Sequence, residues 1–338
     1  MTWQTPLFVF LHSQSTRPVV SFVVFKMTNK LSYPGLKCVL EYLEANLRIH
    51  ITARSPALRK IEKSIPIHLE FLMFSDNIGL NDMQMRVFYN NQIMFRRGEN
   101  EYRRPYPMDL EIEKAVEMLE EYYLGGRMNI YANHFWVFNR EVDSFPKFNA
   151  TTNEMTVYDC LLDDIVQYIN PNSFPLKELT IDCIDDLNHP HICSAKKLCI
   201  ELSEEQNFED PTKINSIQNK DVELIYDFLE RTNVEGIIRH WMENGKETGT
   251  TFAFRGRDGD PTNEIVTDLR NEFSEISSEL TGVNDQYPNG TPGFSIPLTS
   301  SSKILVYGRR NSERFSNEEL VLNVVSSQAD DSTMEMEH

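Results

Sequence analysis

The chain has 338 residues, enough for about two domains, and its 40% hydrophobic and 25% charged residues lie in the range of globular proteins. Its 33 lysines and arginines stand against 51 aspartates and glutamates, so the formal net charge is −18. A field of this sign repels phosphate backbones and anionic lipids, and we therefore expect neither nucleic acid nor a membrane as a partner.

Cysteine usage and the start of the chain predict where the protein resides. The five cysteines are odd in number and widely scattered, which is typical of free thiols in a reducing compartment: Cys38, Cys160, Cys183, Cys193 and Cys199. We therefore expect an intracellular protein, cytoplasmic or nuclear. Residues 1–26 contain two short apolar runs, too short for a membrane span and too interrupted for a signal peptide. We interpret these residues as an appendage, with a misassigned start of the chain as the alternative.

The segment 27–65 has the pattern of three short helices. After Pro34, apolar residues recur at the spacing of one helical face: Leu36, Val39, Leu40 and Leu43. Asn46 is placed to cap a second helix, and Ser55-Pro56 resembles an N-cap followed by proline at the first helical position. Helices this short cannot bury much apolar surface among themselves. We expect them to pack against another part of the chain.

Beyond residue 66 the pattern changes to strands mixed with helices. Residues 67–74 alternate between apolar and polar, residues 85–93 are a weaker candidate strand, and residues 128–138 are rich in aromatic side chains. Helices are predicted from an Asp109 cap to Gly125-Gly126, and over residues 157–169.

A basic cluster interrupts this acidic chain. It contains four arginines interleaved with Glu99 and Glu101, which predicts a solvated loop: Arg96, Arg97, Arg103 and Arg104. A local basic patch could attract an anionic partner in spite of the net charge. The alternating signs favour the solvated loop.

Two seven-residue segments, 176–182 and 195–201, are nearly repeats of each other. Each has an apolar residue, then Leu, then Ile at the same spacing, with Leu179 and Ile181 in the first and Leu198 and Ile200 in the second. This form is typical of the strands of leucine-rich-repeat solenoids, although such solenoids need at least three repeats. The alternative is two ordinary strands of one sheet.

The C-terminal third gives clearer signals. Strands are predicted at 222–226, 250–254, 294–298, 304–307 and 320–325. One helix begins at Thr232 or Asn233 and ends at Gly245, and another runs from Asp260-Pro261 to Gly282. The predicted fold class is thus α+β. A helical unit at 27–65 precedes a mixed α/β region at 66–325, which is divisible near 150–170, and an acidic disordered tail follows at 326–338.

Templates for catalysis and metal binding fail at required positions. His189, His191 and Cys193 would present zinc ligands along a strand, but the paired spacings of structural zinc sites do not occur around them. A calcium loop starting at Asp258 lacks its required glycine and glutamate, and no nucleotide-binding glycine motif is present. We expect no catalytic residue, cofactor or metal. A zinc-dependent enzyme is the remote alternative.

Longer strings of the chain resemble a known family. Residues 31–46 resemble the opening of an F-box, and the chain is similar over about 28–325 to a nematode-expanded family of F-box-related proteins of undetermined function. Five strings and the pair His189-Pro190 carry this likeness: LSYPGLK (31–37), SPALRKIEKSIP (55–66), SFPLKELTI (173–181), SAKKL (194–198) and IRHWMENGKETGT (238–250).

The resemblance implies a function in protein binding. F-box proteins bind a Skp-type adaptor of a cullin ubiquitin ligase through their N-terminal helices, and a downstream β-rich domain of the F-box-associated type holds the substrate. We therefore expect a non-catalytic substrate receptor with these adaptor-facing residues: Pro34, Leu36, Val39, Leu40 and Leu43. The alternative is a self-contained interaction module without adaptor contact, because the apolar stripe could instead pack on the chain's own β region.

Overall fold

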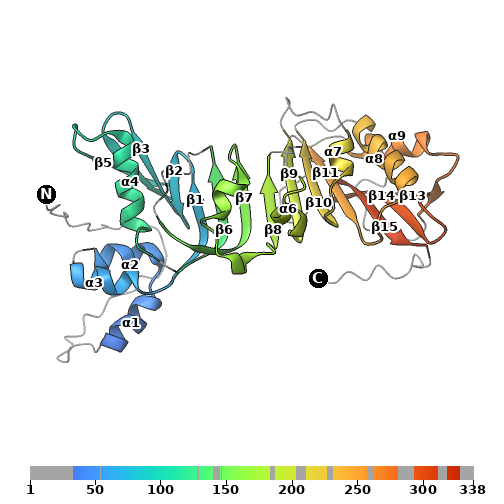
Figure 1. Ribbon diagram of the computed structural model, residues 1–338. Helices are drawn as coiled ribbons and strands as arrows, with labels where there is room; N and C mark the ends of the chain where they lie inside the picture. The colour runs from blue at the N-terminus through green and yellow to red at the C-terminus, as the bar shows by residue number, and fades with distance from the viewer. Residues whose placement is uncertain are drawn as a thin grey trace, which may run out of the picture.

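The computed structural model describes residues 33–53, 55–127, 129–139, 145, 147–182, 187–202, 211–226, 231–256, 262–280, 293–310 and 318–327. Within these ranges the chain is a mixed α/β protein built on one 15-stranded sheet (Figure 1). The predicted appendage at 1–26, the tail from residue 328 onward and Cys183 lie outside the described residues.

Seven adjacent strands at the centre of the sheet are parallel. They are β1 (Ile67–Phe74), β6 (Ile130–Phe138), β7 (Ala150–Tyr158), β8 (Glu178–Ile181), β9 (Lys197–Leu202), β10 (Asp221–Tyr226) and β11 (Thr251–Gly256). From β6 to β11 each strand lies beside its successor in the chain and about 20 to 30 residues from it, the period of leucine-rich repeats. Each crossover therefore returns the chain to the same end of the sheet.

Antiparallel strands flank this parallel centre on both sides. Beside β1 lie β2 (Asn77–Leu80), β3 (Met83–Phe88), β4 (Gln92–Arg97) and β5 (Asn100–Pro105). Beside β11 lie β15 (Glu318–Ser326), β14 (Ser302–Arg310), β13 (Phe294–Pro297) and the short β12 (Ser278–Glu279). These hairpins end the parallel stack.

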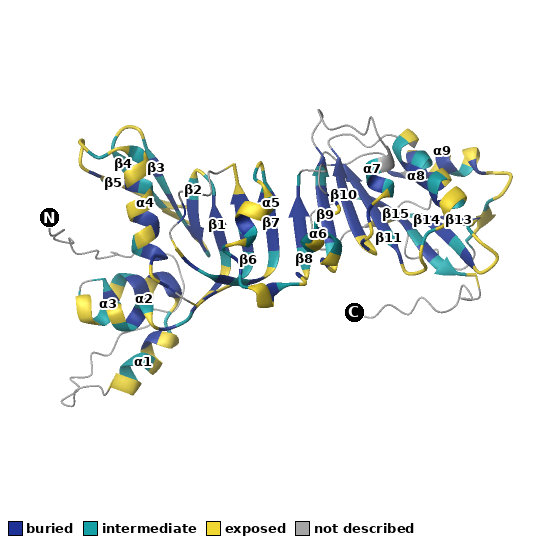
Figure 2. Cartoon of the chain, viewed as in Figure 1, coloured by how far each residue is buried: buried dark blue, intermediate teal, exposed yellow. Residues whose placement is uncertain are grey.

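The helices in the connections from β5 to β12 lie on one side of the sheet (Figure 1). They are α4 (Ile112–Tyr123), α5 (Leu162–Val166), α6 (Pro190–Ser194), α7 (Pro211–Asn215), α8 (Arg231–Asn244) and α9 (Thr262–Glu272), with a 3₁₀ turn at Pro171–Ser173. Their apolar side chains and alternate residues of the strands form one hydrophobic core (Figure 2). In α8, for example, Val234, Ile237, Ile238 and Trp241 are buried, as the helical spacing predicted.

The three predicted N-terminal helices are present as α1 (Tyr33–Glu41), α2 (Ala45–Thr52) and α3 (Pro56–Lys63). Ser55 caps α3 as predicted, with Pro56 at its first turn. The cap of α2 is Glu44 and not Asn46, because the Glu44 carboxylate accepts from the first free backbone amides. The Asn46 side chain is buried and donates instead to the Leu80 carbonyl, 3.2 Å away.

A buried ionic triad fixes α2 and α3 to the sheet. The Glu62 carboxylate accepts from Arg48 Nε at 3.0 Å and from Arg127 Nη2 at 2.6 Å, and each of these side chains is at most 3% exposed. Arg48 also donates to the Pro66 carbonyl, and Arg127 to the Tyr123 carbonyl at the end of α4. Ala45 and Ile49 of α2 join the main core. The helical unit is thus integral to the body of the protein.

Several predicted elements differ from the structure. Residues 150–158 form β7 and only 162–166 are helical, so the predicted helix at 157–169 is wrong over its first half. The segment begins with β-branched threonines, which favour a strand. The arginine cluster forms the β4–β5 hairpin and not a loop, with β4 following β3 where one strand was predicted.

Helix ends were also misplaced at two positions. α4 begins after Glu111, which makes no side-chain cap hydrogen bond, so Asp109 is not its cap. Gly126, with φ +72°, follows the helix end as predicted. α9 ends at Glu272 and not near Gly282, and Ser278–Glu279 is a strand. Phe273, just after the helix, is buried, but Ile276 is 43% exposed. The apolar periodicity of the sequence therefore extends beyond the end of the helix.

Candidate protein-binding surfaces

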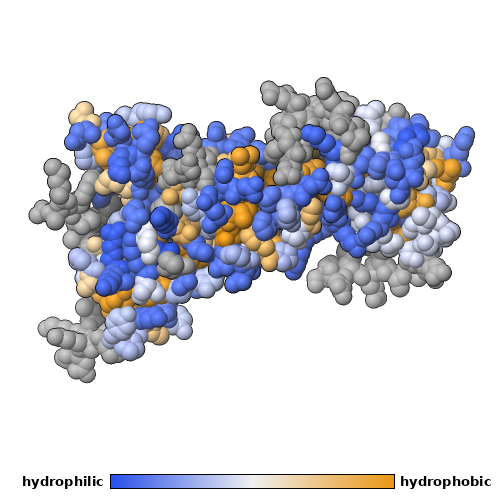
Figure 3. Space-filling view, viewed as in Figure 1, coloured by the Kyte–Doolittle hydropathy of each residue, from blue (hydrophilic) through white to orange (hydrophobic). Residues whose placement is uncertain are grey.

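Apolar side chains are exposed on the first two helices. We call the following set the N-terminal patch: Tyr33, Val39 and Tyr42 in or just after α1, and Leu47 and Ile51 in α2, which are 43% to 87% exposed. Figure 3 shows hydrophobic side chains gathered where α1 lies below α2 and α3. Apolar side chains that gather on a surface are a common mark of a protein interface.

Of the residues predicted to face an adaptor, some are exposed and others are buried or half-buried. Leu40 is buried at 3% exposure, while Leu36 and Leu43 are half-buried. Pro34 and Val39 are exposed, and α1 packs against α3. Part of the predicted stripe therefore packs within the helical unit, and part remains on the surface.

The second surface is the side of the sheet opposite the helices. On β10, Val222, Leu224 and Tyr226 belong to the core shared with the helices. The alternate residues Asp221 and Glu223 point the other way, because neighbouring side chains on a strand face opposite sides. We call this side of β1 and of β6 to β10 the open face.

An aromatic cluster occupies the open face on β1, β6 and β7. The Trp136 indole meets Phe71 edge-on at 5.6 Å between ring centroids and Tyr158 at 6.3 Å. Phe138 meets Tyr158 at 6.2 Å. Phe138 is 42% exposed, and Phe71, Trp136 and Tyr158 are half-buried. These rings could contact a partner without rearrangement of the fold.

Carboxylates follow on the strands next to the aromatic cluster. Parallel register places Glu154 beside Glu178, Glu178 beside Lys197, and Lys197 beside Asp221. A further row contains Asp182 and Glu201 beyond Tyr158, whose hydroxyl donates to the Glu201 carboxylate. Carboxylates thus predominate on this part of the open face.

Two cations neutralise the most buried of these carboxylates. Glu223 is 5% exposed and forms ion pairs with Lys197 Nζ and with Arg255 Nη2, each at 2.9 Å. Lys197 also lies 3.4 Å from Glu178. Both cations are therefore paired with carboxylates of the protein itself. These pairs offset the cost of burying the Glu223 carboxylate, which would be strongly destabilising without them.

Burial raises the pKa of three side chains on the open face, Cys199, Asp182 and Tyr158. Burial, with the nearby Glu223 carboxylate, raises the pKa of the Cys199 thiol, whose Sγ lies 3.5 Å from Glu223. A thiol held neutral in this way is a poor nucleophile. Burial likewise raises the pKa of Asp182 and, together with the Glu201 contact, that of Tyr158.

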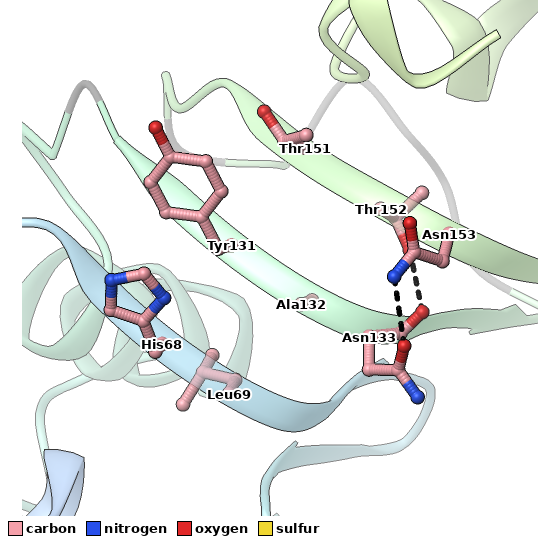
Figure 4. A pocket seen from close by; sticks show the side chains of 8 residues that line it. All are labelled: His68, Leu69, Tyr131, Ala132, Asn133, Thr151, Thr152 and Asn153. Carbon is pink, nitrogen blue, oxygen red and sulfur yellow. Dashed lines mark hydrogen bonds between the residues drawn. The ribbon is translucent and has the colours of Figure 1, made fainter.

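A cavity of about 230 Å³ opens at the end of the face where β1, β6 and β7 begin (Figure 4). His68 stacks on Tyr131 at 4.9 Å on one side, and the Asn133 and Asn153 amides hydrogen bond to each other on the other. Leu69, Ala132, Thr151 and Thr152 complete the lining. The volume is below the ~300 Å³ at which pockets for small-molecule ligands begin. It is closer to the size of one amino-acid side chain.

Residues 111–258 match the family model described as a domain of unknown function (DUF3557). This span begins at the cap of α4 and includes β6 to β11, and therefore most of the open face. No curated protein matches the chain. The N-terminal helices lie outside the matched span, so their likeness to an F-box stays a prediction.

A weak match to a solved structure carries no argument about the fold or activity. That structure is the crystal structure of a S-adenosylmethionine-dependent methyltransferase from Clostridium acetobutylicum, with 11% identity and a TM-score of 0.11. The match covers 56% of this chain and 66% of that chain.

The candidate zinc ligands lie within the matched span and make separate contacts. His189 caps α6 and lies 3.0 Å from Asp163, while His191 stacks on Phe174 at 3.8 Å. The Cys193 thiol donates to the Leu187 carbonyl. Among the described residues, three or more potential ligands converge nowhere on a common point. The segment is a helix, because Pro190 at its first turn favours that conformation and not the strand that the zinc alternative requires.

In the β4–β5 hairpin, which carries the four arginines, two of them pair with carboxylates. Arg97 pairs with Asp82 and Arg103 with Glu101, each at 2.7 Å, and Arg104 lies over the Tyr102 ring.

Within the described part of the chain, no helix has the length and apolar character needed to cross a membrane.

Proposed function

We propose that this protein is a non-catalytic interaction protein with two binding surfaces. The open face holds one protein partner, and the N-terminal patch docks on another, a Skp-type adaptor of a cullin ubiquitin ligase. The observation that carries the proposal is the N-terminal patch, because α2 packs Ala45 and Ile49 into the core and leaves Leu47 and Ile51 exposed.

The order of the parallel strands supports a binding function for the open face. Stacked repeats of this period resemble leucine-rich-repeat solenoids, which use a helix-free face of the sheet as an extended binding surface. On this proposal the protein is a substrate receptor, and substrate and ligase bind at separate surfaces. The alternative proposal is a self-contained interaction module in which the N-terminal patch meets no adaptor.

Capture of partners tests the proposal and separates it from the alternative. The tagged full chain is expected to capture a purified Skp-type adaptor and, through it, the cullin. Val39→Asp places a charge in the N-terminal patch and should abolish capture, because an unpaired charge at an apolar interface is costly. Met108→Asp is the matched control, since Met108 is 89% exposed but lies outside the patch.

Three outcomes decide between the possibilities. Loss of capture in Val39→Asp with retention in Met108→Asp supports adaptor docking. Equal loss in both variants would show that capture depends on general surface properties. Failure of the unaltered chain to capture the adaptor refutes the ligase proposal and leaves the self-contained module.

A further inference from the structure

The side chains of the open face change from aromatic to acidic across the sheet. Its side on β1, β6 and β7 exposes aromatic rings, and its side on β7 to β10 presents carboxylates. The two regions meet at Tyr158, which contacts the Trp136 and Phe138 rings and hydrogen bonds to Glu201. A partner on this face therefore meets π-systems and negative charge side by side.

Lysine and arginine side chains fit both halves of this surface. Their charged groups pair with carboxylates, and the same groups bind favourably over aromatic rings. Their aliphatic stems can lie along apolar surface while the charge remains at a polar site.

Among the described residues, the cations next to these carboxylates are fewer than the carboxylates, although Arg309, which pairs with Glu319, also acts electrostatically on Asp221. Lys197 and Arg255 converge on the buried Glu223, and Lys177 lies 3.1 Å from Glu154. Asp182, Glu201 and Asp221 add three further carboxylates to the same side. In a chain of net charge −18, the surrounding field strengthens the attraction for a cation and does not oppose it.

We propose that the partner of the open face is an extended polypeptide segment rich in lysine and arginine. This inference rests on the proposed function, because it names the class of protein that the open face binds. The cavity at His68 and Tyr131 is of a size to accept one side chain of that segment. The carboxylates of the open face lie on β7 to β10, so the basic part of the segment lies over those strands.

Fluorescence polarisation with labelled peptides tests this inference on the full chain. The probes are a peptide of alternating lysine and valine and two peptides of equal length in which glutamine or glutamate replaces lysine. The lysine peptide is expected to bind, with an affinity that falls as salt is raised. The glutamate peptide should not bind, and the glutamine peptide should bind more weakly than the lysine peptide.

Variants locate the binding site. The double variant Glu154→Gln/Asp221→Asn should weaken the lysine peptide about two- to five-fold for each carboxylate. Phe138→Leu keeps an apolar side chain but removes the ring, and should weaken binding by a similar factor. The matched control is Glu243→Gln/Asp268→Asn, which removes two exposed carboxylates from α8 and α9 on the helix side.

The inference is overturned by any of three results: no probe binds, the control weakens binding as much as the open-face variants, or the glutamine or glutamate peptide binds better than the lysine peptide. In the last case, a loss of that binding in Phe138→Leu would retain the open face as a protein-binding surface and reject only the basic partner. Adaptor capture, tested through Val39→Asp, does not depend on any of these outcomes.

Discussion

Removal of the Glu62 carboxylate is expected to destabilise the whole N-terminal half of the protein. In Glu62→Ala, the Arg48 and Arg127 guanidinium groups would remain buried, at most 3% exposed, without the shared carboxylate at 3.0 and 2.6 Å. Breaking a buried ion pair by removing one partner costs about 3–5 kcal/mol, and this substitution breaks two pairs. We therefore expect the free energy of unfolding to fall by at least about 3 kcal/mol.

Urea denaturation followed by circular dichroism measures this loss. Glu121→Gln is the matched control, because Glu121 is 64% exposed and its pair with Lys63 spans 3.7 Å. That exposed pair should contribute at most about 1 kcal/mol. If Glu62→Ala loses no more stability than Glu121→Gln, the triad does not fasten α2 and α3 to the body. A fragment beginning at Pro66 would then fold as well as the full chain, whereas we expect it to be unstable.

Three further predictions concern the cysteines, the pH dependence of binding and zinc. Alkylation of the native protein should modify the exposed Cys38 readily and leave the buried Cys199 unmodified until the protein is unfolded, and equal rates would contradict this account. Because burial raises the pKa of Asp182, this carboxyl takes up a proton at a higher pH than a free aspartate does. Binding of the lysine peptide should therefore weaken as the pH is lowered, beginning at a higher pH than protonation of a free aspartate would give, and Asp182→Asn should remove part of that dependence. Elemental analysis of the purified protein should find less than one zinc per chain, and a stoichiometric content would favour the zinc-enzyme alternative.

The near-repeat at residues 176–182 and 195–201 shows how much of the fold could be predicted. Alignment of the two segments places Leu179 with Leu198 and Ile181 with Ile200, and these are the register partners of β8 and β9. The prediction of neighbouring strands is confirmed. Sequence similarity could locate this register because both leucines and both isoleucines enter the same core. The remaining strands differ too much in sequence to reveal the same pairing.

Local capping preferences predicted helix ends less well than apolar spacing predicted helix faces. Asn46 and Asp109 are good capping residues by type, but Asn46 is buried against Leu80 and α4 begins after Glu111. Tertiary packing decided both positions. Ser55, which has Pro56 after it and faces no competing tertiary contact of that kind, caps its helix as predicted.

The open face could not be predicted from any local motif, because its side chains come one or two at a time from strands about 20 to 30 residues apart. A general signal was nevertheless present. Parallel strands covered by helices on both faces are continuously apolar, whereas strands with one uncovered face alternate. In β9 the polar or charged positions Lys197 and Glu201 alternate with Leu198 and Leu202, and β10 begins in the same way.

Alternation within parallel strands therefore has a definite meaning in this chain. It shows that helices cover one side of the sheet only, and the side chains of the other side must then be satisfied by one another, by water or by a partner. Lys197, Arg255 and Glu223 satisfy one another, whereas the aromatic cluster around Trp136 and the outer carboxylates are half-buried or exposed. Water solvates carboxylates well but aromatic rings poorly. Exposed rings beside outer carboxylates are thus the part of the open face that gains most from a bound chain, and lysine and arginine are the side chains that would gain most from binding there.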